Sequence, residues 1–260
     1  TNALRGRRDV VIVASVSCIY GLGSPEDYKE MLVDIVPGQA LARDVMLEQL
    51  VNIQYARNDY EPQPGTFRVR GDTVDVFPSY ETTGLRVSFF GDEVEEIRTL
   101  DPVSGRTGTA LRRAVVSPAK HFVMPKSKVE AALGRIGAEL DGRLAELERQ
   151  GKLLEAQRLR QRTEFDLEML RELGYCNGVE NYSLHLDGRR TGQPPATLLD
   201  YFPKDFLLFM DESHISVPQV GGMFNGDRSR KQTLVDYGFR LPSALDNRPL
   251  CFDEFLERIG

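Results

Sequence analysis

The chain has 260 residues, of which 41% are hydrophobic and 28% are charged, and its formal net charge is −6 at pH 7. This composition is typical of a globular protein with one large domain or two to three small ones. The negative net charge excludes attraction of nucleic acid by overall charge, so contact with DNA would need a local basic patch.

Cysteine usage and the longest apolar runs indicate the compartment. Cys18, Cys176 and Cys251 are far apart and odd in number, which excludes a disulfide framework and a CxxC zinc site. No apolar run approaches the length of a membrane span, and the run near the N-terminus has only five residues, so we expect neither signal peptide nor anchor. A cytoplasmic protein without membrane contact is the expectation.

Two apolar segments far apart in the chain predict buried strands. DVVIVASVS (9–17) is short and rich in β-branched residues, as in a parallel sheet. In the stretch that follows it, Ser24 or Pro25 can open a helix with Glu26 in its first turn. FLLFMDES (206–213) has the same buried-strand character as the first segment. We therefore expect both strands in one α/β sheet, with a large insertion between them.

The first part of the insertion alternates between apolar and polar residues. In GTFRVRGDTVDVFPS (65–79), Phe67 and Val69 point one way while Arg68 and Arg70 point the other, and a Gly-Asp turn follows. GLRVSFFGDEVEEI (84–97) repeats the alternation, with Arg86 on the polar side. This pattern predicts an antiparallel sheet with one dry and one solvated face.

Residues 125–174 have the period of amphipathic helices. Apolar residues recur at spacings of three and four, and Gly151 is expected to interrupt the helix. A second helix is predicted from about Lys152 to Leu173, ending before Gly174. RRTGQPPATLL (189–199) is predicted to be a loop.

The acids after the second apolar segment suggest chemistry. Asp211 and Glu212 at a strand end are costly to desolvate unless they hold a cation or a proton. In RecA-like nucleotide hydrolases the first such acid holds magnesium and the second polarises the attacking water. A solvated turn is the alternative. No GK[ST] phosphate loop occurs, so we expect no bound cofactor and no ATP hydrolysis by this chain alone.

Long motifs carry a resemblance that spans essentially the whole chain. They are VIVASVSCIYGLGSPEDY (11–28), QYARND (54–59), GTFRVRGD (65–72), GKLLEAQRLRQRTEFDLEML (151–170), GYCNGVENYS (174–183) and DESHISVPQVGGMFNGDRSRKQTLVDYGFRLPSALDNRPLCFDEF (211–255). They resemble the UvrB family, the damage-verifying subunits of the bacterial nucleotide excision repair excinuclease. The resemblance implies an ATP-dependent, helicase-like protein that receives damaged DNA from UvrA and recruits UvrC.

The resemblance also implies a domain organisation. The fold class expected is α/β and α+β multidomain, with part of a RecA-like helicase motor, an inserted mainly antiparallel β domain and a helical subdomain. Residues 1–30 and 206–260 would belong to the motor domain, 31–124 to the UvrA-interaction domain and 125–205 to the helical subdomain. We expect the chain to be the central part of such a protein, without the phosphate loop, the second motor domain or the DNA-wedging hairpin.

Roles at the nucleotide site follow from the resemblance. Asp211 and Glu212 would be catalytic in the intact protein, with Asp211 holding Mg²⁺ together with ATP. His214 and Ser17 would couple to the nucleotide. As an isolated residue, His214 is equally read as a structural hydrogen-bond donor.

The family's UvrA contacts match Arg57, Arg68, Arg70 and Arg86, while Ser88 stands where the family often has an acid. A row of guanidinium groups suits carboxylates on a partner, although a merely solvated face is the reading from the residues alone. We expect charge reversal at Arg68 and Arg70 to break docking with little change in stability. Nearby acids argue against a phosphate track: Asp72, Asp75, Asp92, Glu93, Glu95 and Glu96.

Two further groups of charged residues have open roles. Arg162 and Glu180 match family positions near the DNA, with a structural ion pair as the alternative. Arg228, Arg230 and Lys231 form a basic cluster that either contacts the DNA backbone or lies in a solvated loop. The alternative to the repair function is a non-enzymatic UvrA-docking module, like that of the transcription-repair coupling factor. The strand end at Asp211 favours the repair function.

Overall fold

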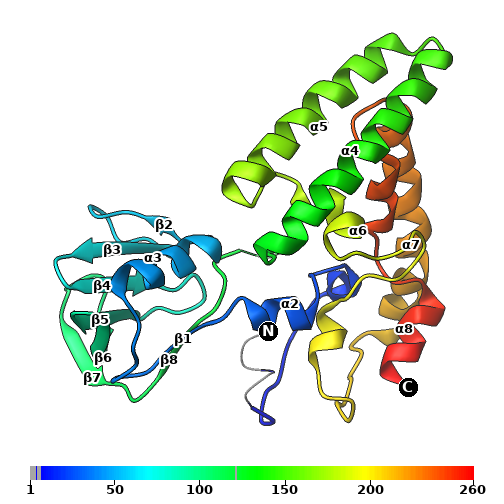
Figure 1. Cartoon of the computed structure of the whole chain (residues 1–260). Helices are drawn as coiled ribbons and strands as arrows, with labels where there is room; N and C mark the ends of the chain where they lie inside the picture. Colours follow the sequence, from blue (N-terminus) through cyan, green and yellow to red (C-terminus); the bar gives the residue numbers. More distant parts are fainter. Residues whose placement is uncertain (1–3, 5–6, 121) are drawn as a thin grey trace. The chain divides into compact units, whose positions relative to one another are not determined.

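The computed structural model describes residues 4, 7–120 and 122–260, which form two compact units. The sheet unit comprises Glu26–Pro125, and the helical unit comprises Thr1–Pro25 and Lys126–Gly260. Figure 1 shows strands gathered in the first and long helices in the second. The protein is therefore of mixed α/β composition, with its described strands all in the sheet unit.

Among its described residues, the sheet unit contains a six-stranded sheet with the order β2-β3-β4-β5-β6-β7. All neighbouring pairs are antiparallel except β2 and β3, which are parallel. A separate antiparallel pair joins β1 to β8. The elements are α2 (Pro25–Glu30), β1 (Val33–Ile35), α3 (Arg43–Asn52), β2 (Ala56–Arg57), β3 (Thr66–Arg70), β4 (Thr73–Phe77), β5 (Gly84–Phe90), β6 (Glu93–Leu100), β7 (Thr107–Ala110) and β8 (Ala114–Val116).

The core of the sheet unit confirms the alternation read from the sequence. Phe67, Val74 and Val87 are buried on one face of the six-stranded sheet, together with Met46 and Leu50 of α3. The tight turn between β3 and β4 contains Gly71, whose positive φ of 57° favours glycine. The opposite face carries the arginines.

The helical unit is built around a hairpin of two long helices, which Figure 1 shows side by side. Gly151, with a φ of 74°, lies in the turn between the two helices. Gly174 caps the second helix in the left-handed conformation. Both predicted helix boundaries are therefore confirmed. The elements are η1 (Val16–Ile19), α4 (Lys126–Arg149), α5 (Leu153–Leu173), η2 (Val179–Tyr182), α6 (Ser183–Leu186), η3 (Leu198–Tyr201), α7 (Ser213–Asp236), η4 (Pro242–Asp246) and α8 (Phe252–Ile259).

The two predicted buried strands, 9–17 and 206–213, are wrong. Residues 10–15 and 206–210 have no regular secondary structure, η1 begins at Val16, and α7 begins at Ser213. Val13 is 96% exposed and Phe209 is 83% exposed. A parallel strand is stabilised by ladder hydrogen bonds to neighbours, and the described part of the helical unit contains no strand beside either segment.

The described helices include none that is both long enough and apolar enough to cross a lipid bilayer.

Candidate functional site

The centre of the arginine face is a buried carboxylate. In the register of the sheet, Asp75 of β4 lies between Arg68 of β3 and Arg86 of β5. Arg86 donates from Nε and Nη2 to the two oxygens of Asp75 at 2.6 and 2.8 Å, and Arg68 donates from Nε at 2.8 Å. We call these three residues the Asp75 triad. Two fixed guanidinium groups therefore surround one carboxylate.

Electrostatics keep the Asp75 carboxylate ionised. Burial opposes ionisation of Asp75, which is 2% exposed, but the hydrogen bonds from Arg86 and Arg68 outweigh it and lower the pKa of Asp75. The pKa of Arg86 is raised by the same hydrogen bond. With two cations and one anion, the triad has an excess positive charge at neutral pH.

The expectation that Arg68 is a freely solvated side chain is wrong. Arg68 is 8% exposed and its guanidinium lies 5.6 Å from the centre of the Phe77 ring. The reason is cross-strand pairing, because Asp75 stands directly opposite Arg68 and binds its Nε. Charge reversal at Arg68 is consequently expected to affect stability as well as docking.

The other predicted docking residues are more accessible. Arg70, at the end of β3, is exposed and lies opposite Thr73. Arg57 of β2 pairs with Asp59 at 2.9 Å, with more than half of the arginine side chain exposed. Ser88 lies on β5 between Thr73 and Glu96 of the neighbouring strands. Arg70, Arg86 and Arg57 are thus the predicted residues that a partner can reach.

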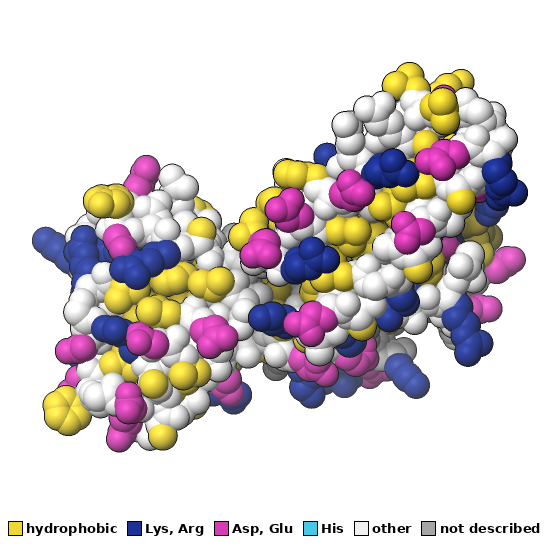
Figure 2. All heavy atoms as spheres, turned by 45° about the horizontal axis from the view of Figure 1, so that its top comes forward, with side chains coloured by type: hydrophobic (Ala, Val, Ile, Leu, Met, Phe, Trp, Pro, Cys, Tyr) yellow, Lys and Arg dark blue, Asp and Glu magenta, His cyan; other side chains and the backbone are white. Residues whose placement is uncertain are grey.

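Acidic and basic side chains are interspersed over the visible surface of both units (Figure 2).

A cavity of about 950 Å³ in the helical unit lies between the two apolar segments. Residues 10–16 and 205–211 contribute to its lining, together with Ser216 and Val220 of α7. Ser15 and Asp211 therefore line one cavity although they are far apart in the chain. Ser17, Glu212 and His214 are outside this lining, although Ser17 Oγ lies 2.5 Å from Ser15 Oγ.

Asp211 and Glu212 stand at the start of α7 instead of at a strand end. Glu212 has φ 46° and ψ 47°, a left-handed conformation uncommon for a residue with a side chain. The Asp211 carboxylate accepts a hydrogen bond from the Glu212 amide at 3.0 Å, and the Asp211 carbonyl accepts one from Ser216 Oγ at 2.8 Å. His214 Nδ1 is 3.4 Å from Glu212 Oε2. The two carboxylates and the Ser216 hydroxyl are oxygen donors of the kind that Mg²⁺ with its retained waters prefers.

Arg162 and Glu180 lie in one corner of the helical unit, around Cys176. Arg162 donates to Asp166 at 2.9 Å and to the Asn177 carbonyl at 2.7 Å. Burial raises the pKa of Cys176 to about 12, with Asp166 and Glu180 raising it further and Arg162 opposing them. Arg162 thus has the structural ion pair that was the alternative to DNA contact.

The cluster Arg228, Arg230 and Lys231 is not in a loop, because it lies within α7. Lys231 is buried, is 2.9 Å from Asp227 and donates to the carbonyl of Asn247. Arg230 also pairs with Asp227, at 3.0 Å. Lys231 is therefore a structural residue.

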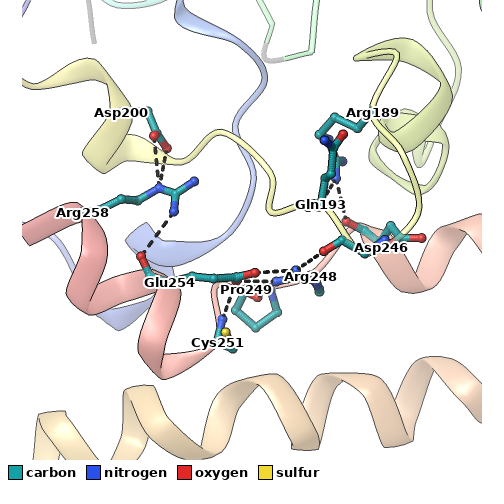
Figure 3. A network of polar contacts seen from close by, with 10 residues as sticks. Arg189, Gln193, Asp200, Asp246, Arg248, Pro249, Cys251, Glu254 and Arg258 are labelled. Carbon is teal, nitrogen blue, oxygen red and sulfur yellow. Dashed lines mark hydrogen bonds and ion pairs between the residues drawn. The ribbon is translucent and has the colours of Figure 1, made fainter.

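Sequence reasoning missed the network in Figure 3. Arg248 donates to both oxygens of Glu254 at 2.7 and 2.8 Å and to the Gly192 carbonyl at 2.9 Å. Burial opposes the ionisation of Glu254, but Arg248 outweighs it and lowers the pKa of Glu254 to about 2. Glu254 also accepts from the amide of Cys251 at 2.9 Å. The spacing of a capping box was the available signal, obscured because cysteine replaces the usual serine or threonine.

Comparison with models of known protein families first defines the class of protein to which the two units are similar. Residues 33–122 match the family model described as the UvrB interaction domain, and residues 127–188 match the UvrB third helical domain. A β-rich interaction domain followed by a helical domain agrees with the two kinds of unit seen in the fold.

The relatives identify the family. The chain is 59% identical over 259 residues to the UvrABC system protein B of Dehalococcoides mccartyi. It is 58% identical to that of Streptomyces coelicolor and 57% identical to that of Methanothermobacter thermautotrophicus. All of the chain is covered in each case, and it spans 36% to 40% of the length of these relatives. The chain belongs to the UvrB family.

Proposed function

We propose that this chain acts in nucleotide excision repair, as the part of a UvrB protein that docks onto UvrA through the exposed arginines of the sheet unit. The observation that carries the proposal is the Asp75 triad with Arg70 beside it. Planar guanidinium groups held in place by a buried acid suit discrete carboxylates on a partner protein. The match to the UvrB interaction domain and the names of the relatives support this partner.

The intact protein is proposed to be an ATPase of the superfamily 2 helicase type. In it, residues 1–30 and 206–260 would belong to a RecA-like motor domain, and residues 31–124 and 125–205 would be the docking domain and the helical subdomain. Support comes from the cavity that both apolar segments line. When bound, Mg²⁺ neutralises phosphate charge and positions ATP.

Four residues of this chain are proposed to act at the ATP site of the intact protein. Asp211 would hold the metal, and Glu212 would accept a hydrogen bond from the attacking water and orient it. Ser17 and His214 would couple the site to the rest of the protein; His214 already contacts Glu212. Glu212→Gln in the full-length protein should keep ATP binding and lower turnover about a hundred-fold or more.

Damaged double-stranded DNA and UvrC complete the proposed set of partners. Arg162 and Glu180 would lie near the DNA, with Arg162 held by Asp166 so that only part of its guanidinium is available. After verification of the damage, the protein would recruit UvrC for incision.

The second candidate is a docking module without enzymatic activity. The arginines would serve both candidate functions equally. The acids at the start of α7 distinguish the two functions, because only an ATPase needs them. A full-length protein in which Asp211→Asn leaves ATP turnover unchanged would support the docking module alone.

The docking proposal is tested by titrating UvrA with Arg70→Glu and, as a matched control, Arg113→Glu. Arg113 is also exposed in the sheet unit but pairs with Asp34 of β1, away from the six-stranded sheet. Loss of a close interfacial charge pair weakens binding by about 2–5 kcal/mol, so Arg70→Glu should abolish detectable docking and the control should not. Equal affinities of the two variants would refute the docking assignment.

A further inference from the structure

The Asp75 triad continues onto a fourth strand. Arg86 of β5 is directly opposite Arg98 of β6, so the cross-strand sequence on one face is Arg68, Asp75, Arg86, Arg98. Residues that face each other in antiparallel strands point to the same side of the sheet. Three guanidinium groups and one carboxylate therefore lie in a line across β3 to β6. We call this line the arginine row.

Arg98 is held in place and remains accessible. Its Nε is 2.8 Å from Glu96 Oε1 and its Nη1 donates to the Gly108 carbonyl at 3.1 Å. The side chain is 41% exposed. Pairing with Glu96 raises the pKa of Arg98 and lowers that of Glu96, so both stay charged at neutral pH. The guanidinium is thus oriented before any partner binds, which reduces the entropy lost on binding.

The position of Arg98 is unfavourable for the isolated sheet. Like charges directly opposite each other in neighbouring strands destabilise the pair. The carboxylate of Asp75 relieves this repulsion only in part, because its single negative charge is shared between Arg86 and Arg68. Glu96 also relieves it only in part, since the row itself carries three positive charges against the one negative charge of Asp75.

We propose that Arg98 is a further contact residue of the docking surface, binding a carboxylate of the partner next to the one bound by Arg86. This inference rests on the proposed docking function and extends its surface to β6. Neighbouring strands are about 4.8 Å apart, so the two arginines fit two adjacent acidic side chains of a protein. A DNA backbone fits less well, because Glu93 and Glu95 lie at the start of the strand that carries Arg98 and Asp92 directly precedes it.

The test compares Arg98→Gln, Arg86→Gln and Arg113→Gln in the 260-residue chain by titration with UvrA, with a thermal melt of each variant. Arg98→Gln should weaken binding about tenfold or more without lowering the melting temperature, and Arg113→Gln should bind like the parent. Arg98→Lys, which keeps the charge, should recover part of the affinity. A duplex DNA titration of the same variants accompanies these measurements.

The outcomes separate this inference from the docking proposal. Weakened binding by Arg86→Gln with normal binding by Arg98→Gln would overturn the inference and leave docking in place. Normal binding by both would overturn the docking proposal itself. A loss of duplex DNA binding by Arg98→Gln, with UvrA binding unchanged, would assign Arg98 to nucleic acid instead.

Discussion

Charge reversal at Arg68 is expected to destabilise the sheet unit strongly, whereas the same change at Arg70 is not. The Arg68 side chain is 9% exposed and its Nε is 2.8 Å from Asp75, which is 2% exposed. Glutamate at position 68 would place a second carboxylate beside the first and leave Arg86 as the remaining cation of the triad. Arg70 is exposed, so reversal there changes only solvated charge.

The magnitude follows from what remains bound to Asp75. Breaking a buried ion pair by removing one partner costs about 3–5 kcal/mol, and the added negative charge places Arg68→Glu at or above this range. Arg68→Met removes the cation without adding an anion. Since Asp75 keeps two hydrogen bonds from Arg86, this change should cost about 1.5–3 kcal/mol, typical of one hydrogen bond to a charged group. Arg70→Glu should stay within about 0.5 kcal/mol of the parent.

Thermal and urea unfolding followed by circular dichroism measure these differences. One kcal/mol shifts the melting temperature of a domain of this size by about 4–8 °C, so Arg68→Glu should lower that of the sheet unit by roughly 12 °C or more. Arg68→Met should fall between it and Arg70→Glu. If Arg68→Glu and Arg70→Glu melt together, Arg68 is not held in a buried pair and the reasoning fails.

Three further predictions concern the helical unit. Gly238→Ala should destabilise the helical unit much more than Gly188→Ala. Both glycines have a positive φ, but of the two only Gly238 has backbone beside the new Cβ, which would lie 2.3 Å from a carbonyl oxygen. Equal urea midpoints of the two variants would contradict this. The pKa of Glu254 is lowered to about 2, so its ionised form should contribute on the order of 3 kcal/mol to the free energy of unfolding above about pH 4.5. This contribution should be lost as the pH falls toward 2. In an Arg248→Met variant, the free energy of unfolding should not show this loss between pH 4.5 and 2. Cys176, buried and with its pKa raised to about 12, should react with iodoacetamide at pH 8 far more slowly in the native protein than in urea, and equal rates would show that the thiol is accessible.

The periodic segments were predictable from the sequence because their information is local. The spacing of apolar residues in 125–174 indicated two helices, and α4 and α5 end within a few residues of the glycines that interrupt the period. The alternation around Gly71 indicated the β3–β4 hairpin, because the two faces of a strand differ at every second residue. Asp211 and Glu212 stood out as acids next to an apolar run, although their roles stay predictions.

The structure of residues 10–15 and 206–210 depends on neighbours. Their β-branched and aromatic composition is typical of strands, but a strand exists only when another chain segment accepts and donates its ladder hydrogen bonds. The described residues beside them contain no such segment, and the composition of the segments themselves carries no information about it.

The sequence by itself determined that Arg68, Arg70 and Arg86 share one face of a sheet, because side-chain direction follows from strand alternation. Only the tertiary structure decided that Arg68 is buried, that Asp75 binds it together with Arg86, and that Arg98 continues the row. These contacts depend on the register between strands, in which residues 7 to 12 positions apart in the chain become direct neighbours. A pattern within one strand does not specify that register, so the chemistry of the face emerges only when the strands pair.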